Sequence, residues 1–346
     1  MNATPWAIVL AGGDGTRLKS LSRLLSGDDR PKQFCSLLGG NTLLSRTRAR
    51  LAPTLPPEHT LFVVVRAHEP FYRAELADLD QAQIVVQPTN RGTTAAIIYG
   101  LVRLTRLEQG DPIVALFPTD HDYVDEGRFA QAVRSAMDIV REHHGRLVLL
   151  GAEADNAEVE YGWIEPGSAL IGECSGESLF RVSRFWERPS AGIARGLPGK
   201  RCLWNTFVVV GRARTFLDVL ASTVPATCRA FDPLTGDRND RAEFECARRI
   251  YETLQAGDFS HQVLSVCTER LAVLRLGKVG WSDLGTPERV RVAAELRART
   301  WLSSVGADNG ARPDREAGGT LRNKVGATPA FEAWLDAYRR RLPKIF

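Results

Sequence analysis

The stretch Ile8-Val-Leu-Ala-Gly-Gly-Asp-Gly-Thr-Arg-Leu18, followed by Arg30-Pro-Lys-Gln-Phe34, is the most informative part of this 346-residue chain. An apolar run at residues 6–10 is typical of a buried strand, and it leads directly into a glycine-rich turn. Because glycine lacks a Cβ atom, backbone N–H groups in such a turn can approach an anion, and the chain can adopt positive φ. Two fixed positive charges, Arg17 and Lys32, come next. The stretch therefore predicts a loop that handles phosphate groups.

Three other interpretations of this glycine loop fit less well. A P-loop requires Lys-Ser or Lys-Thr after its last glycine, whereas Thr16-Arg17 follows Gly15 here. A dinucleotide-binding loop matches only at Gly13 and Gly15, because Leu18 stands in place of the third glycine. A simple tight turn would account for the glycines but not for the Arg and the Pro-Lys that follow them.

The composition is that of an ordinary globular protein, since 44% apolar and 25% charged residues disfavour the disordered and membrane-spanning classes. The formal net charge of +4 is small for this length and no basic run is interleaved with aromatic residues, so no nucleic-acid partner is expected. The six cysteines contain no C-x-x-C pair, which argues against a zinc site or a disulfide framework. The first residues lack the basic and apolar segments of a signal peptide. We therefore expect a cytoplasmic protein without membrane association, and the sequence leaves open whether it forms a homo-oligomer.

Apolar runs and amphipathic helices alternate along the first half of the chain. Runs typical of buried strands occupy residues 61–65, 84–86, 113–117 and 147–150, with helical patterns between them at 42–51, 71–79, 93–104 and 129–140. This alternation predicts an α/β fold with a doubly wound, mostly parallel sheet. From Glu153 the sequence changes to acidic, glycine-containing loops, with shorter strands at 179–185 and 203–210. These predict a small antiparallel substrate lobe covering the sheet.

The C-terminal part of the chain predicts helices. A helical pattern covers residues 287–300 and starts with proline, a residue favoured in the first turn. Residues 303–326 are rich in Gly, Asp, Asn and Arg and predict a flexible loop, after which a last helix is expected at 329–341. We therefore expect a main domain over residues 1–292 and a short helical C-terminal appendage over residues 293–346.

Two carboxylates follow apolar strands, where open α/β sheets place ligand-binding groups. Asp120 ends the run Pro-Thr-Asp, and Asp283 lies in the run Trp-Ser-Asp-Leu-Gly-Thr. One or two carboxylates with phosphate oxygens form the usual Mg²⁺ site, because this small ion keeps several waters and takes few protein ligands. We therefore expect Asp120 and Asp283 to bind Mg²⁺. The alternatives are a turn-forming role for Asp120 and helix capping by Asp283, which lies too early for a good cap.

His121 stands between Asp120 and Asp122, and a histidine beside an aspartate could suggest acid–base chemistry. Transfer at phosphorus depends more on positioning and charge neutralisation than on a proton acceptor, because an attacking phosphate is already an anion. We therefore expect a structural role for His121.

The segment Gln87-Pro-Thr-Asn-Arg-Gly-Thr-Thr94 joins a strand to the start of a helix. Free N–H groups at a helix N-terminus, together with a glycine, let a ligand approach the backbone closely. The segment is a candidate for ligand contact, and the alternative is a loop capped by threonine.

The run Leu10-Ala-Gly-Gly-Asp-Gly-Thr-Arg-Leu18 with the later Pro31-Lys32 resembles the signature of the sugar-phosphate nucleotidyltransferases. The run Pro31-Lys-Gln-Phe34, with Leu37-Leu-Gly-Gly40 and Leu43-Leu44, is similar to the bacterial mannose-1-phosphate guanylyltransferases (GDP-mannose pyrophosphorylases) in particular. The resemblance spans residues 8 to about 292. It implies a Rossmann-like nucleotidyltransferase fold. It also implies a reaction of a nucleoside triphosphate, GTP in that branch, with a sugar 1-phosphate, mannose 1-phosphate in that branch, giving a nucleoside-diphosphate sugar and pyrophosphate.

The resemblance also implies roles for individual residues of the main domain. The catalytic residues implied are Arg17, Lys32 and Asp120, and the metal ligands implied are Asp120 and Asp283. The nucleotide-binding residues implied are Leu10, Ala11, Gly12, Gly13, Gly15, Thr16, Gln87, Gly92 and Thr93. The sugar-phosphate-binding residues implied are Gly162, Glu187, Arg188 and Asn205. The aromatic residues near these last positions, Tyr161, Trp163, Trp186 and Trp204, fit a hydrophobic core equally well.

The sequence departs from the family pattern at three places. Asn90-Arg91-Gly92 stands where guanylyltransferases usually have Arg-Asn-Thr, which argues less clearly for guanine. Arg188 replaces the lysine of a Glu-Lys-Pro motif, keeping the charge but offering a larger, planar donor group. Thr206 and Phe207 replace small residues of a Trp-Asn-Ser-Gly motif, which would reshape a sugar pocket. Two rival hypotheses remain: a catalytically silent binding homologue, and a cytidylyltransferase for a non-sugar alcohol phosphate.

Overall fold

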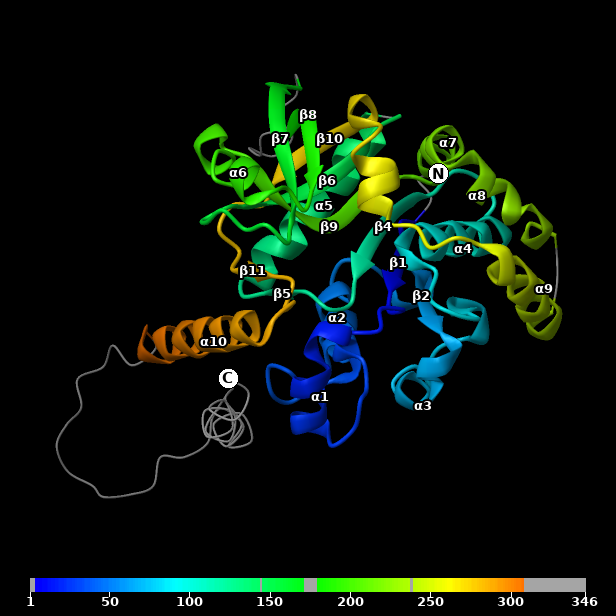
Figure 1. Cartoon of the computed structure of the whole chain (residues 1–346), viewed down its shortest axis with the longest axis horizontal. Helices are drawn as coiled ribbons and strands as arrows, with labels where there is room; N and C mark the ends of the chain where they lie inside the picture. The colour runs from blue at the N-terminus through cyan, green and yellow to red at the C-terminus, as the bar shows by residue number, and fades with distance from the viewer. Residues whose placement is uncertain (1–3, 144, 171–178, 237–238, 308–346) are drawn as a thin grey trace.

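A computed structural model describes residues 4–143, 145–170, 179–236 and 239–307 of the chain (Figure 1). Residues 303–307 of the expected loop continue a helix, whereas its remaining residues and the helix expected at 329–341 lie outside the described residues. Nowhere in the described ranges does a helix combine the length and the apolar character needed to cross a membrane.

Within the described residues, nine strands form one sheet in the spatial order β3-β2-β1-β4-β9-β6-β10-β8-β7, and β5 pairs with β11 in a second, two-stranded sheet. The strands expected at 61–65, 84–86, 113–117 and 147–150 are confirmed as parts of β2, β3, β4 and β6. The strands are β1 (Trp6–Leu10), β2 (Thr60–Val65), β3 (Ile84–Gln87), β4 (Ile113–Pro118), β5 (Asp122–Tyr123), β6 (Leu147–Glu153), β7 (Gly162–Ala169), β8 (Leu179–Glu187), β9 (Leu203–Arg212), β10 (Leu271–Arg275) and β11 (Trp281–Ser282).

The large sheet is mixed rather than mostly parallel, which corrects the sequence expectation. Strands β3, β2, β1 and β4 run parallel, and so do β6 and β10. Strand β9 lies antiparallel between β4 and β6, and β8 lies antiparallel to both β10 and β7. The antiparallel strands therefore extend the same sheet instead of forming a lobe that covers it. An apolar run buried on both faces has the same composition whichever way its neighbours point, so the sequence pattern carried no information on strand direction.

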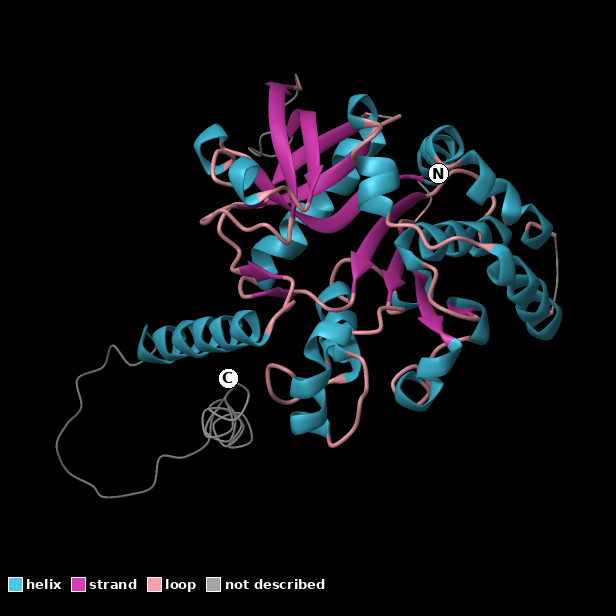
Figure 2. Cartoon of the chain, viewed as in Figure 1, coloured by secondary structure: helices cyan, strands magenta, loops and turns pink. Residues whose placement is uncertain are grey.

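Helices cover both faces of the large sheet (Figure 2). On one face residues of α4, α7 and α9 share a hydrophobic cluster with Ile8 and Leu116, and on the other face residues of α2 and α5 share a cluster with Ala7 and Phe117. This division follows from strand geometry, because successive side chains point to opposite faces. The helices are α1 (Lys19–Ser26), α2 (Leu43–Leu51), α3 (Glu69–Tyr72), α4 (Gly92–Leu107), α5 (Glu126–Glu142), α6 (Ala191–Ala194), α7 (Ala213–Thr223), α8 (Pro225–Ala230), α9 (Asp240–Thr253) and α10 (Pro287–Ala307), with the short helices η1 (Thr16–Leu18), η2 (Lys32–Phe34) and η8 (Ser260–Leu264) near the site.

Helix α10 belongs to the packed body of the molecule. It contributes Val290, Ala293 and Ala294 to a third hydrophobic cluster, whose other members include Leu18 and Leu21. The boundary expected between residues 292 and 293 therefore falls inside a helix whose residues on both sides of that point pack into the same cluster.

The parallel strands β1, β2, β3 and β4 end at one edge of the sheet. The glycine-rich loop follows β1, residues 88–91 follow β3, and residues 119–121 follow β4. The pairing of β11 with β5 brings the run that contains Asp283 to the same edge. Open α/β sheets bind ligands at the carboxyl ends of their strands, so this edge is the place to look for a site.

Candidate active site

The loop that follows β1 is closely packed at two glycines, and Gly15 in particular has no space for a side chain. A Cβ atom on Gly15, whose φ is 59°, would lie 2.7 Å from the backbone nitrogen of Lys32. A Cβ atom on Gly12 would lie 2.7 Å from Nε2 of Gln87. On Gly13 a Cβ atom would meet nothing within 4 Å, so this part of the loop faces open space. The loop thus presents bare backbone beside Lys32, an arrangement suited to a phosphate group.

Gln33 fixes the path of this loop. Its side-chain nitrogen Nε2 donates to the backbone oxygens of Ala11 (3.0 Å) and Gly13 (2.8 Å), and the residue is buried. Gln33 follows Lys32 in η2, so one short helix supplies both the amide that holds the loop and the neighbouring ammonium. The sequence analysis assigned Gln33 no role, because a local pattern does not show which distant carbonyls a side-chain amide reaches. Its place directly after the Pro-Lys pair was the available signal.

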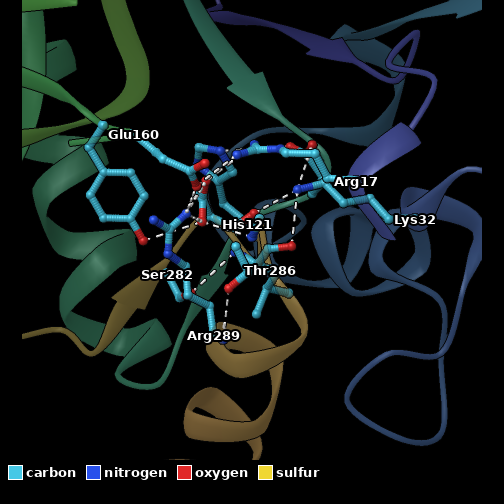
Figure 3. Close-up of polar contacts among 12 residues, drawn as sticks. Arg17, Lys32, His121, Glu160, Ser282, Thr286 and Arg289 are labelled. Atoms are coloured by element: carbon cyan, nitrogen blue, oxygen red, sulfur yellow. Dashed lines mark hydrogen bonds and ion pairs between the residues drawn. The ribbon is translucent and has the colours of Figure 1, made fainter. Parts of the chain in front are cut away.

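Lys32 joins the ends of β4 and β11 (Figure 3). Its buried ammonium lies 3.1 Å from Oδ2 of Asp120 and donates to the backbone oxygen of Asp283 (2.7 Å). Burial would raise the pKa of Asp120, but the charge of Lys32 and its hydrogen bond to the carboxylate lower that pKa below its ordinary value. Asp120 is therefore ionised at neutral pH, and three segments far apart in the sequence meet at one positive charge.

The carboxylate of Asp283 is held from three directions. Its Oδ1 accepts hydrogen bonds from the phenol of Tyr161 (3.2 Å), the backbone N–H of Gly285 (2.8 Å) and the guanidinium of Arg289 (3.0 Å). The hydroxyl of Thr286, rather than Asp283, accepts from the backbone N–H of Arg289 in the first turn of α10 (3.2 Å). Asp283 is therefore not the helix cap, and its carboxylate faces the guanidinium groups of Arg289 and Arg17.

Arg17 is more exposed than Lys32 and Arg289, with 49% of its side-chain surface accessible. Its guanidinium pairs with Glu160 (3.0 Å) and lies 3.8 Å from Oδ2 of Asp283 (Figure 3). An exposed ion pair of this kind contributes little stability, so Arg17 is free to turn toward a bound anion.

Asp120 and Asp283 fit a Mg²⁺ ion as donors. Across the described residues, no three His, Cys, Asp or Glu side chains form a metal-binding cluster. Two carboxylates suit an ion that takes few protein ligands and completes its shell with phosphate oxygens and water. In this structure each carboxylate is paired with a protein cation, Asp120 with Lys32 and Asp283 with Arg289.

His121 is wedged between β9 and β11. Its Nδ1 lies 3.1 Å from the backbone oxygen of Thr206 and 3.3 Å from Nε1 of Trp281. Burial is the largest influence on its pKa and lowers it below the ordinary value, although the nearby carboxylates of Asp120 and Asp283 oppose this shift. A neutral ring held between strands agrees with the structural role expected for His121.

The ends of β1 and β3 place three of the predicted nucleotide-side residues around the loop. Gln87 is buried at the end of β3, where its Oε1 accepts from the phenol of Tyr251 (3.1 Å). The backbone oxygen of Leu10 accepts from the hydroxyl of Thr119 (2.8 Å), which ties the base of the loop to the end of β4. Thr16 opens η1 on the far side of the loop.

Gly92 and Thr93, at the start of α4, face a different segment from the loop. A Cβ atom on Gly92 would lie 2.2 Å from the backbone oxygen of Gly257, and φ at Gly92 is 81°. The hydroxyl of Thr93 accepts from the backbone N–H of Phe259 (2.8 Å). The helix start is therefore packed against residues 257–259, and this contact explains the glycine at position 92 without a ligand.

Asn90 connects the loops after β1 and β3, and its partner Asp14 also reaches the loop after β2. Its Nδ2 donates to Asp14 (2.9 Å), and Nε2 of His68 lies 3.4 Å from the other oxygen of that carboxylate. Its Oδ1 accepts from the backbone N–H of Gly92 (2.9 Å). Asn90 and Asp14 together thus hold the three loops, a role that no local pattern indicated.

Gly162, Glu187 and Asn205 lie together on the antiparallel strands. A Cβ atom on Gly162 would lie 2.9 Å from Oε2 of Glu187 and 3.2 Å from Cβ of Asn205. Burial raises the pKa of Glu187 to about 7, and the negative charge of Asp258 adds to the shift. The structure therefore brings three of the four predicted sugar-side residues into contact.

Arg188 differs from these three neighbours. Its backbone has φ 47°, and 65% of its side-chain surface is exposed. Its Nε lies 3.6 Å from Oε1 of Glu187, so the guanidinium is only loosely paired and is accessible from solvent.

Thr206 and Phe207 make contacts with strand β6 and with Phe259. The hydroxyl of the buried Thr206 donates to the backbone oxygen of Leu150 (2.7 Å). Phe207 has φ 61° and packs against the ring of Phe259, with 6.2 Å between ring centroids. The two residues lie in the stretch of β9 where its pairing with β6 is irregular.

The sequence profile described as nucleotidyl transferase matches residues 6–298, a span that contains every residue of this cluster. The chain belongs to the nucleotidyl transferase family. The xanthan biosynthesis protein XanB of Xanthomonas campestris is 29% identical over 284 residues, covering 81% of this chain and 57% of that protein. The mannose-1-phosphate guanylyltransferase of Escherichia coli K12 is 31% identical over 287 residues, covering 81% of this chain and 58% of that protein. This nucleotidyl transferase chain therefore spans somewhat more than half the length of these curated relatives.

Solved structures agree with this family assignment. The crystal structure described as mannose-1-phosphate geranyltransferase from Thermus thermophilus matches with a TM-score of 0.69 and 28% sequence identity. The match covers 82% of this chain and 77% of that one.

Proposed function

We propose that the chain transfers a nucleoside monophosphate from a nucleoside triphosphate to a sugar 1-phosphate and releases pyrophosphate. One observation carries the proposal: the segments of Asp120 and Asp283 meet at the buried ammonium of Lys32, beside the bare backbone of a glycine-rich loop. Two carboxylates for a divalent ion and fixed cations for phosphate charge are what this reaction requires.

The triphosphate binds along the glycine-rich loop in this proposal. Backbone N–H groups near Gly13 and the side chains of Arg17 and Lys32 would neutralise its charge. Asp120 and Asp283 would hold Mg²⁺, which polarises the phosphate oxygens when bound. The predicted roles of Gln87, Gly92 and Thr93 beside the base remain part of the proposal, although Gly92 and Thr93 face residues 257–259.

The chemical step needs no general base from the protein. A phosphate oxygen of the sugar 1-phosphate attacks the α-phosphorus of the triphosphate, forming a new P–O bond. The bond from that phosphorus to the bridging oxygen breaks, and pyrophosphate leaves with the electron pair. A neutral, buried His121 fits this scheme, because the attacking group is already an anion.

Residues on the antiparallel strands would hold the sugar 1-phosphate. Gly162 lies against Glu187 and Asn205, whose side chains can bind hydroxyl groups of a sugar. The accessible guanidinium of Arg188 would bind the phosphate through two donors. GTP and mannose 1-phosphate are the specific substrates that we propose. The guanylyltransferase relative and the run Pro31-Lys-Gln-Phe34 support this choice.

Pyrophosphate release tests the proposal against its two rivals. Four nucleoside triphosphates would be combined with mannose 1-phosphate, glucose 1-phosphate and a non-sugar alcohol phosphate, each with Mg²⁺. We expect the fastest release with GTP and mannose 1-phosphate. Release only with CTP and the alcohol phosphate would support the cytidylyltransferase hypothesis. Nucleotide binding without release from any pair would support the silent homologue and contradict the proposal.

A further inference from the structure

Arg289 connects four groups around the candidate metal site. Its Nη1 lies 3.0 Å from Oδ1 and 3.2 Å from Oδ2 of Asp283, so one donor spans both carboxylate oxygens. The same guanidinium pairs with Glu158 (2.6 Å) and Glu160 (3.2 Å) and lies 4.3 Å from the centroid of the Tyr161 ring. Only 14% of its side-chain surface is exposed. This cation is therefore locked between Asp283 and two other carboxylates (Figure 3).

A carboxylate held in this way cannot accept a divalent ion unchanged. Asp283 is itself nearly buried, and a buried carboxylate requires a counter-charge. Arg289 supplies that charge here. A Mg²⁺ ion on the same carboxylate would face the guanidinium at short range, and like charges at such distances repel strongly outside bulk water.

We propose that Arg289 is an internal counter-cation of Asp283, which holds the carboxylate in the metal-free protein and withdraws when a divalent ion binds. This inference rests on the proposed metal site, and it makes Arg289 a positioning residue rather than a catalytic one. The sequence analysis gave Arg289 no role, because its partners come from the loop before β7 and from the segment after β11.

The surroundings of Arg289 provide a place for the withdrawn guanidinium. A cavity of about 690 Å³ borders Arg289 and is lined by the carboxylate-bearing residues Glu153, Asp155 and Glu158. Glu158 already binds Nη2, and Glu160 shares Nη1 with Asp283, so a small rotation would release Asp283 without leaving the cation unpaired.

Manganese binding tests the inference independently of activity. Mn²⁺ would be titrated into the full chain without nucleotide, and free Mn²⁺ would be followed by electron paramagnetic resonance. We expect Arg289→Gln to bind Mn²⁺ roughly tenfold more tightly than the wild type, because the competing charge is gone. Arg289→Gln should also melt at a lower temperature than the wild type in EDTA, with Mn²⁺ recovering part of the loss.

Arg291→Gln is the matched control. It removes the same charge from the same helix, but Arg291 pairs with Glu288 and Glu295 at the surface, away from Asp283. If Arg291→Gln tightens Mn²⁺ binding as much as Arg289→Gln does, the gain comes from the change in net charge, and the inference is overturned. If Arg289→Gln does not fold, Arg289→Lys replaces it, with a smaller gain expected because a cation without the planar fork remains.

A second substitution locates the effect. Adding Asp283→Asn to Arg289→Gln should abolish the gain in Mn²⁺ affinity, and a gain that persists would overturn the assignment. Equal Mn²⁺ affinities of Arg289→Gln and the wild type, together with normal pyrophosphate release, would contradict this inference but not the proposed function. A gain located at Asp283 without pyrophosphate release from any substrate pair would contradict the proposed function alone.

Discussion

At the scale of single residues, the candidate site is a set of charges that neutralise one another. Lys32 faces Asp120, Arg289 faces Asp283, and Arg17 faces Glu160. The first and third pairs join segments that are far apart in the sequence and so require the whole fold, whereas Arg289 and Asp283 are six residues apart. Substrate and metal must replace some of these contacts. Single substitutions should therefore have effects that differ between ligand-free stability and activity.

Glu187 should make stability depend on pH. Burial raises its pKa from 4.5 to about 7, so the folded state holds this proton more tightly than the unfolded chain does. The resulting stabilisation is complete below pH 4.5 and is lost as the pH rises to about 7. We expect Glu187→Gln to raise the melting temperature relative to the wild type by more at pH 8 than at pH 5. Thermal unfolding at both pH values measures this.

The control for Glu187→Gln is Glu245→Gln, which changes a carboxylate paired with Arg248 on the surface of α9. The melting temperature of Glu245→Gln should differ little from that of the wild type at both pH values. If Glu187→Gln changes the melting temperature equally at pH 5 and pH 8, folding does not raise the pKa of Glu187.

Arg188 should affect binding of the sugar 1-phosphate without affecting stability. Its side chain is mostly exposed and only loosely paired with Glu187, so few native contacts depend on it. Loss of a charge-assisted contact costs about 1.5–3 kcal/mol, so Arg188→Ala should raise KM for the sugar 1-phosphate at least tenfold. Arg188→Lys should recover only part of the loss, because an ammonium lacks the two-donor fork. Steady-state kinetics with each substrate varied in turn would refute the role if KM for the sugar 1-phosphate stays unchanged.

At the scale of helices and strands, the local sequence predicted that a helix or strand exists better than it predicted which other segments that element contacts. The strand-loop-helix start at β1 and the strands β2, β3, β4 and β6 followed from apolar runs and glycines, and so did the position of Asp120 at a strand end. The antiparallel placement of β9 did not follow, because a fully buried run looks the same in either direction. The contacts of Gln33 and Arg289 depend on which distant segments meet, which no local period encodes.

Helix α10 is anchored by a buried ion pair that should be important for stability. Arg297 donates from Nε and Nη2 to the two oxygens of Asp122 (2.8 and 2.7 Å), and Asp122 is fully buried in β5. Removing one partner of a buried pair typically costs about 3–5 kcal/mol, because the remaining charge is uncompensated. Arg50 lies 3.8 Å from Asp122, so we expect Arg297→Gln to cost about 3 kcal/mol, at the lower end of that range.

Urea unfolding of Arg297→Gln and of the surface variant Arg291→Gln measures this anchoring. The surface variant should cost less than about 1 kcal/mol. Equal free energies of unfolding for the two variants would show that α10 is not held by Asp122.

At the scale of the whole molecule, helix α10 crosses the domain boundary that the sequence predicts between residues 292 and 293. A helix pattern starting at Pro287 was readable, and the structure continues that helix to Ala307. Its packing against Leu18 and Leu21 was not readable, because these residues lie at the opposite end of the main domain's sequence. Two chains that end at residues 292 and 307 test this view. The shorter chain loses Ala293, Ala294 and Arg297.

We expect the chain ending at residue 292 to unfold at a markedly lower temperature than the chain ending at residue 307. The reason is the loss of buried apolar surface together with the Arg297–Asp122 pair. Calorimetry of both chains gives the answer. Equal melting temperatures would restore the boundary expected between residues 292 and 293.

In the proposed function, Asp120 places a divalent ion for nucleotidyl transfer to a sugar 1-phosphate. The most direct test is formation of the nucleotide sugar from GTP and mannose 1-phosphate at saturating Mg²⁺, compared between the wild type and Asp120→Asn. We predict turnover by the wild type and a fall of at least about a hundredfold in kcat for Asp120→Asn, with metal-free nucleotide binding retained. Near-normal turnover by Asp120→Asn would contradict the account.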